Sequence, residues 1–235
     1  MRLDKFISHR SPLSRSQVRP ALKQGRITIN GEIATNAAQK LTADDIIALD
    51  NTVLNPFEEH YWMFHKPLDC VCANQDSDHP TVLDFFADED LPLKKALQIV
   101  GRLDIDTTGL VLLTTNGQWN HWVTSPKYQC EKRYLVTLTD NISTEAIQQL
   151  ENGVKLANEP YPTKPAKVEV LFTNEIRLTI SEGRYHQVKR MLAAVGNHVE
   201  ALHRESIGTI QLDEFLAPGE YRPLTQAEID SVTPS

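Results

Sequence analysis

The sequence predicts an α+β fold with a largely antiparallel sheet. The segments that we expect as strands and helices follow one another irregularly along the 235 residues, without the regular strand–helix alternation of a parallel sheet. Asn-Gly pairs, which favour tight turns, close two of the strand-like runs, at Asn30-Gly31 and Asn116-Gly117. With 40% hydrophobic residues, a chain of this length forms one or two domains with buried cores. We expect a small module of helices plus a β-hairpin over residues 1–57. A domain with a mixed, mostly antiparallel sheet flanked by helices follows over residues 60–235.

Two short helices are expected first. In MRLDKFI the apolar residues recur with helical spacing and share one face. A second helix begins at Ser14, whose hydroxyl can cap it, because Gln17 follows three residues later as in a capping box. Pro20 lies inside this second pattern, lacks an N–H group and disfavours helical angles at Arg19. We therefore expect a kink or a late start there.

A hairpin and a linker are expected after these helices. Ile27 and Ile29 alternate with other residues, Asn30-Gly31 supplies a type I′ turn, and Ile33 resumes the strand. The segment DNTVLNPFEE, residues 50–59, is polar and contains a proline, which is typical of a linker.

The remaining elements are longer. YWMFH predicts a strand that ends at Lys66-Pro67, and GLVLLTT is a continuous apolar run that the turn Asn116-Gly117 closes. RYLVTL and EIRLTIS predict further strands. STEAIQQLENG predicts a helix that ends at Gly153, and YHQVKRMLAAVGN predicts one that ends at Gly196.

Charge is distributed unevenly along the chain. The net charge of −7 and the pI of about 5.6 argue against a nucleic-acid-binding protein, whose usual footprint is basic. Residues 1–30, however, contain seven Lys/Arg and one acid, for a net charge of +6, which leaves −13 for the rest. This asymmetry predicts a basic docking module attached to an acidic body. The seven basic residues are Arg2, Lys5, Arg10, Arg15, Arg19, Lys23 and Arg26.

The cysteines and the apolar runs indicate the compartment. Cys70, Cys72 and Cys130 are few and odd in number, which disfavours a disulfide framework and favours a reducing compartment. No apolar run reaches the roughly 18–20 residues of a membrane span. The N-terminal MRLDKFISHR lacks the uninterrupted apolar stretch of a secretory signal. We expect a cytoplasmic protein that does not associate with membranes.

The stretch GRLDIDTTGL, residues 101–110, places two aspartates two positions apart among apolar residues. One hypothesis is a Mg²⁺-dependent phosphatase, in which Asp104 is the nucleophile and Asp106 a general acid. The context disfavours it, because Gly101-Arg102 interrupts the buried strand that should precede the motif. A second cluster of metal-binding acids should also follow, and downstream only Asp213-Glu214 is a candidate.

The longer string GRLDIDTTGLVLLTTNG resembles the motif around the catalytic aspartate of RNA pseudouridine synthases. The similarity continues in EKRYLVTL, SEGRYHQVKRM and LHRESIG, and residues 1–49 resemble the S-four-type RNA-binding module, named for the ribosomal protein. Together these motifs resemble the RsuA family of bacterial small-subunit (16S) rRNA pseudouridine synthases. The resemblance implies an isomerase that breaks the C1′–N1 bond of a uridine, rotates the uracil and joins C5 to C1′. It implies no cofactor, metal or ATP, and a monomer whose partner is 16S rRNA or an assembling small ribosomal subunit.

The resemblance also assigns roles to single residues. The nucleophile of the family is the Asp of G-R-L-D, here Asp104, and Asp106 is then a structural turn or helix-cap acceptor. Tyr134 in EKRYLV matches the active-site tyrosine, which can stack on a uracil that has left its base stack. Lys189 in GRYHQVKR matches the basic partner that keeps a carboxylate ionised in a dry pocket, with Arg184 and Arg190 as alternatives.

RNA contacts are expected in both parts of the chain. Arg102 lies two residues before the nucleophile and would hold phosphate or the displaced strand, and Arg184 would contact RNA near it. The N-terminal module would dock on folded rRNA through Arg15, Arg19, Lys23 and Arg26. An rRNA-binding assembly factor that has lost catalysis stays open as an alternative.

One segment departs from the family pattern, which reads K-P-x-G and often has Asn before the lysine. In HKPLDC, His65 and Asp69 stand at the Asn and Gly positions, which leaves the local turn geometry open. We expect this segment to support the site. Cys70 and Cys72 with His65 or His79 would form a zinc site only with about four well-placed ligands, and alternate residues of a strand point to opposite faces. We therefore expect buried free thiols.

Overall fold

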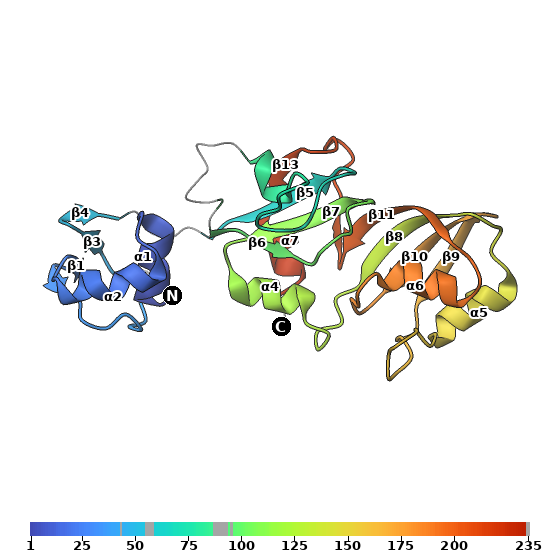
Figure 1. The fold of residues 1–235 in the computed structure, drawn as a ribbon, viewed down its shortest axis with the longest axis horizontal. Helices are drawn as coiled ribbons and strands as arrows, with labels where there is room; N and C mark the ends of the chain where they lie inside the picture. Colours follow the sequence, from blue (N-terminus) through green and yellow to red (C-terminus); the bar gives the residue numbers. More distant parts are fainter. Residues whose placement is uncertain (43, 55–58, 87–93, 95, 234–235) are drawn as a thin grey trace. The chain divides into compact units, whose positions relative to one another are not determined.

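The structure is a computed structural model that describes residues 1–235 except 43, 55–58, 87–93, 95 and 234–235 (Figure 1). The chain divides into two compact units. The first consists of Met1–Glu59 with Ala87–Leu97, and the second of His60–Phe86 with Gln98–Ser235. Among the described residues, no helix combines the length and the apolar composition that crossing a membrane requires.

The first unit packs two helices against a small sheet. Its apolar cluster joins Leu3, Phe6 and Ile7 of the first helix to Val18 and Leu22 of the second and to the inner face of the strands. The strands pair antiparallel in the order β2-β1-β3-β4. The predicted module of helices plus a hairpin is confirmed. Its elements are α1 (Leu3–Arg10), α2 (Arg15–Lys23), β1 (Ile27–Ile29), β2 (Glu32–Ile33), β3 (Ile47–Leu49) and β4 (Thr52–Val53).

The second helix begins where the capping signal predicts. The Ser14 N–H group donates to Gln17 Oε1 at 2.7 Å, and helical geometry starts at the next residue. The alternative of a late start at Pro20 is wrong, because α2 continues through Pro20 to its end. Val18 and Leu22 are buried on either side of the proline, so core packing holds the helix across it.

A second hairpin replaces part of the predicted linker. The strands β3 and β4 pair across Asp50 and Asn51, whose φ angles are +51° and +64°. Asp and Asn tolerate this left-handed conformation, which a type I′ turn requires at both central residues. The linker prediction is therefore wrong for residues 50–53, and its residues 55–58 lie outside the described part of the chain.

The second unit is built on a nine-stranded sheet, whose main path runs β13-β5-β7-β11-β8-β10-β9, with β6 on β7 and β12 on β11. All pairings are antiparallel except that of β7 with β11, so the predicted fold class is confirmed. Figure 1 shows α5 and α6 beside the β8–β10 part of the sheet and α4 beside β6 and β7. The elements are β5 (Tyr61–Lys66), β6 (Gln98–Val100), β7 (Thr107–Thr114), α4 (Gly117–Thr124), β8 (Lys132–Leu138), α5 (Thr144–Asn152), β9 (Lys167–Phe172), β10 (Glu175–Ile180), α6 (Gln187–Ala194), β11 (Val199–Ile207), β12 (Ile210–Gln211), β13 (Tyr221–Pro223), α7 (Gln226–Ser231) and a 3-10 turn at Val82–Phe85.

The Asn116-Gly117 pair starts a helix and does not close a hairpin. The Asn116 side chain accepts hydrogen bonds from the N–H groups of Gln118 and Trp119 and caps α4. Trp119 and Val123, four residues apart, are buried in the core on one face of this helix. The turn prediction failed because asparagine serves equally well as a helix N-cap.

Gly109 allows the central parallel pair to form. Its φ is +106°, and a Cβ atom built there would lie 2.4 Å from the carbonyl oxygen of Arg204 on β11. Only glycine fits such a close approach of two backbones. This contact sets the start of β7 directly beside Leu202 and Arg204.

Candidate active site

Asp104 lies in the loop that leads into β7, and a buried lysine holds this loop. The carbonyl of Asp104 accepts a hydrogen bond from Thr107 N–H at 3.1 Å, which forms a tight turn. The Lys66 side chain is fully buried, and its Nζ donates to the carbonyls of Pro67, Ile105 and Thr107 at 3.0, 3.3 and 2.8 Å. Burial lowers the pKa of Lys66. The ammonium group thus fixes the backbone on both sides of Asp106.

Asp69, which stands where the family pattern has glycine, adopts a backbone conformation that glycine takes without strain. Its φ is +57°, in the left-handed region, which aspartate tolerates better than most residues. Its N–H group donates to the carbonyl of Ile105 at 3.1 Å. The segment His65–Asp69 therefore contacts the loop of Asp104 directly, and the departure from glycine leaves that contact intact.

Arg204 supports the other side of the same loop. Its side chain is 2% exposed, its Nε donates to the carbonyl of Leu110 at 2.7 Å, and its Nη1 donates to the carbonyl of Arg102 at 3.4 Å. The loop before β7 is thus held from β5 and from β11.

The start of α6 is fixed by a buried glutamine. Gln187 Oε1 accepts from the N–H group of Arg184 at 2.8 Å, and its Nε2 donates to Glu182 Oε1 at 3.0 Å. His186 precedes the helix with φ +48°, and Lys189 lies in the first helical turn. The tight turn at residues 182–187 therefore determines where both side chains point.

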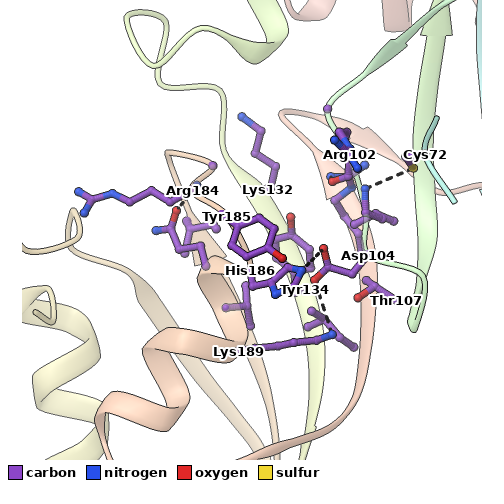
Figure 2. Close-up of a pocket in the computed structure, with 18 of the residues that line it drawn as sticks. Cys72, Arg102, Asp104, Thr107, Lys132, Tyr134, Arg184, Tyr185, His186 and Lys189 are labelled. Atoms are coloured by element: carbon purple, nitrogen blue, oxygen red, sulfur yellow. Dashed lines mark hydrogen bonds and ion pairs between the residues drawn. The ribbon is translucent and has the colours of Figure 1, made fainter. Parts of the chain in front are cut away.

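The side chains of His186 and Lys189, both from this segment, lie close to the Asp104 carboxylate (Figure 2). His186 Nε2 lies 3.3 Å from Asp104 Oδ1, and Lys189 Nζ lies 3.5 Å from Asp104 Oδ2. Lys189 Nζ also donates to Asp106 Oδ1 at 2.5 Å. This hydrogen bond from Lys189 lowers the pKa of Asp106, against a smaller opposing effect of burial. Asp106 is thus an ion-pair partner of Lys189, which differs from the predicted cap.

These residues line a cavity of about 640 Å³ in the second unit. Tyr134 reaches it from β8 and is 8% exposed, while Tyr185 at its mouth is 76% exposed. The Lys and Arg residues outnumber the acids in the lining, which gives a cationic site on a chain of net charge −7. The charged lining residues are Arg102, Lys132, Arg184, Lys189 and Arg204 against Asp104, Asp106 and Glu182.

The structure brings together the catalytic candidates named from the sequence. Asp104, Tyr134 and Lys189 line one cavity although they are far apart in the chain, and Arg102 and Arg184 line it too. Arg102 is exposed and has no hydrogen bond or ion pair from its guanidinium within the described residues. Figure 2 shows Arg184 on the far side of Tyr185 from Arg102.

Arg184 and Arg190 are occupied by contacts within the chain. Arg184 donates to the carbonyls of Tyr161 and Pro162 at 2.9 and 2.8 Å, and Arg190 donates to the carbonyl of Ala157 at 2.7 Å. Both arginines therefore fasten the 157–162 loop, and of the three proposed cations only Lys189 contacts Asp104. An RNA contact of Arg184 stays a prediction.

The four basic residues predicted to dock RNA all lie in the first unit. Arg15 pairs with Asp4 at 3.2 Å, and Arg26 pairs with Asp50 at 2.6 Å. Arg19 and Lys23 are exposed on α2. The role of these four residues in RNA binding stays a prediction.

Sequence reasoning missed His186, Tyr185, Arg204 and the clamp by Lys66. The only available signal for His186 was its position three residues before Lys189 in GRYHQVKR, and a single histidine is weak evidence. Tyr185 lies in the same string, and its stacking on His186 gives no signal in the sequence, whereas Arg204 and Lys66 act through contacts between segments that are distant in sequence.

The donor set does not favour the metal-dependent alternatives. Across the part of the chain that is described, no three His, Cys, Asp or Glu side chains are grouped to hold a metal ion. Asp213 is bound by Arg222 at 2.7 Å and, like Glu214, does not line the cavity of Asp104. Cys70 and Cys72 are buried free thiols, as expected, although only an isolated bridge at Val71 replaces the strand assumed there. Burial raises the pKa of Cys70 to about 11.

Comparison with known proteins agrees with this geometry. A family model of RNA pseudouridylate synthases matches residues 60–194, and a model of the S4 domain matches residues 1–47. The chain therefore belongs to the RNA pseudouridylate synthase family, whose members isomerise uridine to pseudouridine.

Its relatives include the ribosomal small subunit pseudouridine synthase A of Escherichia coli, which is 54% identical over 233 residues, 99% of this chain and 100% of the relative. The protein of the same name from Haemophilus influenzae is 52% identical over 233 residues, 99% of each chain. A crystal structure of a pseudouridylate synthase, 50% identical, matches with a TM-score of 0.72 over 99% of this chain and 100% of the other.

Proposed function

We propose that the protein isomerises one uridine of 16S rRNA to pseudouridine, with Asp104 as the nucleophile. The observation that carries this proposal is the position of the Asp104 carboxylate, which lies in a cationic cavity with one oxygen near Lys189 and the other near His186. A carboxylate that is to attack must stay ionised, and a neighbouring ammonium group favours the ionised form.

The product is an isomer of the uridine. The C1′–N1 and C5–H bonds break, and the C1′–C5 and N1–H bonds form, with the C5 proton passing to solvent and N1 taking a proton from solvent. Asp104 stabilises the intermediate by adding to C1′ or to the base, and it is released when C5 bonds to C1′. No electron acceptor is required, so we propose that the chain works without cofactor, metal or ATP.

Tyr134 has the position and the chemistry to receive the uracil. The base must leave its stack to enter the cavity, which costs a few kcal/mol, and stacking on an aromatic ring offsets about 1–3 kcal/mol of this cost. Tyr134 is largely buried in the cavity wall on β8, where its ring is held by the sheet. We infer that its ring face contacts the flipped base, and that Arg102, whose guanidinium is exposed, binds phosphate or the displaced strand.

The first unit supplies the second part of the proposal. We propose that residues 1–57 act as the rRNA-docking domain through Arg15, Arg19, Lys23 and Arg26, and that residues 60–235 act as the catalytic domain. The printed names of the relatives support small-subunit rRNA as the substrate, as naked RNA or in an assembling particle. A monomer in the cytoplasm that needs no membrane fits this role.

The decisive experiment incubates the protein with 16S rRNA in the presence of EDTA and maps pseudouridine. Product at one position with the native protein, and none with Asp104→Asn at unchanged RNA affinity, would support the proposal. Asp106→Asn is the matched control, because it removes a carboxylate two residues away but keeps an oxygen that can accept the hydrogen bond from Lys189, and it should retain most of the turnover. RNA binding without product would favour the assembly-factor alternative, and phosphate release that needs Mg²⁺ would favour the phosphatase.

A further inference from the structure

His186 occupies a position that the proposed roles of Asp104, Tyr134 and Lys189 do not explain. Its Nε2 atom lies 3.3 Å from Asp104 Oδ1, on the opposite oxygen from Lys189. In Figure 2 its ring lies between Tyr185 and the Asp104 carboxylate. A side chain so close to the nucleophile will also be close to the sugar–base bond that the nucleophile attacks.

The imidazole ring is held in place from three sides. The backbone of His186 has φ +48°, in the left-handed region that few non-glycine residues adopt and that histidine adopts more readily than most. Tyr185 stacks on the ring with centroids 3.8 Å apart and planes inclined by 21°. The next residue, Gln187, is buried and hydrogen-bonded at both ends of its amide. The ring is therefore oriented before substrate arrives.

The neighbour of Nε2 is an acceptor. His186 Nε2 lies 3.3 Å from Asp104 Oδ1, and a carboxylate oxygen accepts hydrogen bonds but cannot donate them. We assign the hydrogen atom of the imidazole to Nε2 on this ground, which gives the site an N–H donor beside the Asp104 carboxylate. Lys189 faces the other side of the carboxylate, where its ammonium group lies near Asp104 Oδ2 and Asp106 Oδ1.

We propose that His186 is a catalytic residue whose Nε2–H group hydrogen-bonds O2 of the uracil while the C1′–N1 bond breaks. The inference rests on the proposed function. Whichever atom Asp104 adds to, cleavage of this bond leaves its electron pair on the base, at N1 and the adjacent O2. The Nε2–H group, which lies near Asp104 Oδ1 in the free protein, donates to O2 at that moment, and no proton is transferred. A preoriented donor aimed at charge that develops in the transition state typically contributes a factor of about 100 to 1,000 in rate.

Two substitutions separate the donor from the backbone conformation. His186→Gly removes the ring and accepts the positive φ without strain, and His186→Asn also tolerates this φ but keeps an N–H donor. Under single-turnover conditions with saturating 16S rRNA, we expect His186→Gly to lower the rate roughly 100-fold with RNA affinity within about twofold of native. His186→Asn should recover at least about a tenfold part of that loss. His79→Gly, at an exposed residue outside the cavity, is the matched control and should leave the rate unchanged.

An RNA with 2-thiouridine at the target position tests the contact itself, since sulfur accepts hydrogen bonds more weakly than oxygen. If His186 donates to O2, the ratio of the uridine rate to the 2-thiouridine rate is higher for the native protein and His186→Asn than for His186→Gly. Equal ratios in the three proteins, or a native rate in His186→Gly, would overturn this inference while leaving the synthase activity in place. Absence of pseudouridine with the native protein would instead refute the proposed function.

Discussion

Lys189 is the residue on which the electrostatics of the site depend. A single ammonium group lies between two carboxylates, Asp104 and Asp106, and the ion pair with Asp106 is the shorter one. Because it faces both, Lys189 limits the repulsion between two acids that the chain places only two positions apart. The arrangement also shows why Asp106 is useful without attacking anything: it holds the amine in position beside Asp104.

Replacing Lys189 by methionine should be visible first at Asp106. The pKa of Asp106 is low because Lys189 donates a hydrogen bond to it, so Lys189→Met should move the pKa upward, toward the ordinary aspartate value of about 3.9. The carboxyl carbon shift of Asp106, followed by NMR against pH, measures this change. Lys155→Met, which removes an exposed amine elsewhere, should leave the titration where it is. An unmoved Asp106 titration in Lys189→Met would show that the ion pair does not form in solution.

The residues of the site differ in how far they can be predicted from sequence. Asp104, Tyr134 and Lys189 lie in strings whose letters are informative together, so a family resemblance names them one by one. His186 is in one of the same strings, but its function depends on a left-handed backbone angle and on stacking by Tyr185. Lys66 resembles any lysine at a strand end until the fold brings the carbonyls of Ile105 and Thr107 to it.

At the scale of elements, the loop before β7 is the part of the fold on which the site depends most. Lys66→Met keeps the length of the side chain and leaves buried carbonyls without donors, which should lower the free energy of unfolding by about 1–3 kcal/mol. The amide protons of Asp69 and Thr107, which bond within this loop, should exchange faster with solvent. Lys132→Met is the control, because that lysine also donates to carbonyls, those of Val123 and Cys130. Lys132→Met should lower the free energy of unfolding by a similar amount without accelerating amide exchange at Asp69. Equal acceleration at Asp69 in both variants would contradict the clamp by Lys66.

The close approach of β7 and β11 at Gly109 gives a second prediction at this scale. A methyl group there would collide with the Arg204 backbone, so Gly109→Ala should destabilise the second unit by about 3 kcal/mol or more. Gly196→Ala is matched to it, because Gly196 also has a positive φ, +81°, but no atom near its would-be Cβ. That variant should lose only about 1 kcal/mol. Urea unfolding curves measure both losses, and similar values would mean that the strands can separate at this point without penalty.

Element types were more predictable than their ends and turns. The strands at Tyr61–Lys66 and Lys132–Leu138 and the helix α5 with its Gly153 terminus follow from periodicity and stop signals. The helix cap at Asn116 and the turn at Asp50-Asn51 could not be predicted from sequence, because the same polar residues occur in caps, turns and linkers. At Asn116 the helix is favoured by the packing of Trp119 in the core, and at Asp50-Asn51 the turn is favoured by the pairing of β4 with β3.

At the scale of the whole molecule, the positive charge expected to attract RNA and the proposed catalytic residues lie in different units. The first thirty residues carry a net charge of +6, whereas residues 31–59 carry −5, so we expect long-range attraction to RNA to be concentrated at the two helices of the first unit and not over the whole unit. Arg19 and Lys23 project from α2 into solvent, and Arg15 is only partly neutralised by Asp4. We expect this unit to account for most of the salt dependence of binding.

Changing Arg15, Arg19 and Lys23 together to alanine should weaken rRNA binding. It should also reduce the slope of log Kd against log salt by roughly 2 to 3, because about 0.7–0.9 counterions are retained per lost phosphate contact. Filter binding across a salt series measures this slope. Removing the same charge from the second unit, by Lys127→Ala, Lys155→Ala and Lys167→Ala, should change it less. A slope that is unaffected by the first triple change would place the docking surface elsewhere.

The pairing of β13 with β5 has a consequence for the timing of synthesis. Among the described residues, the apolar cluster of the first unit consists of residues between 3 and 54, whereas the strand Tyr61–Lys66 pairs with Tyr221–Pro223, which is made much later. During translation at about 5–20 residues per second, roughly 10 to 30 seconds separate the emergence of these two segments. Until residues 199–207 have been made, the nascent chain carries the basic N-terminal segment and an unfinished cavity, because β11 supplies Leu202 and Arg204 to the lining and is not yet paired with β7. If the two units act as proposed, we expect the nascent chain to bind RNA before β11 and β13 complete the catalytic unit.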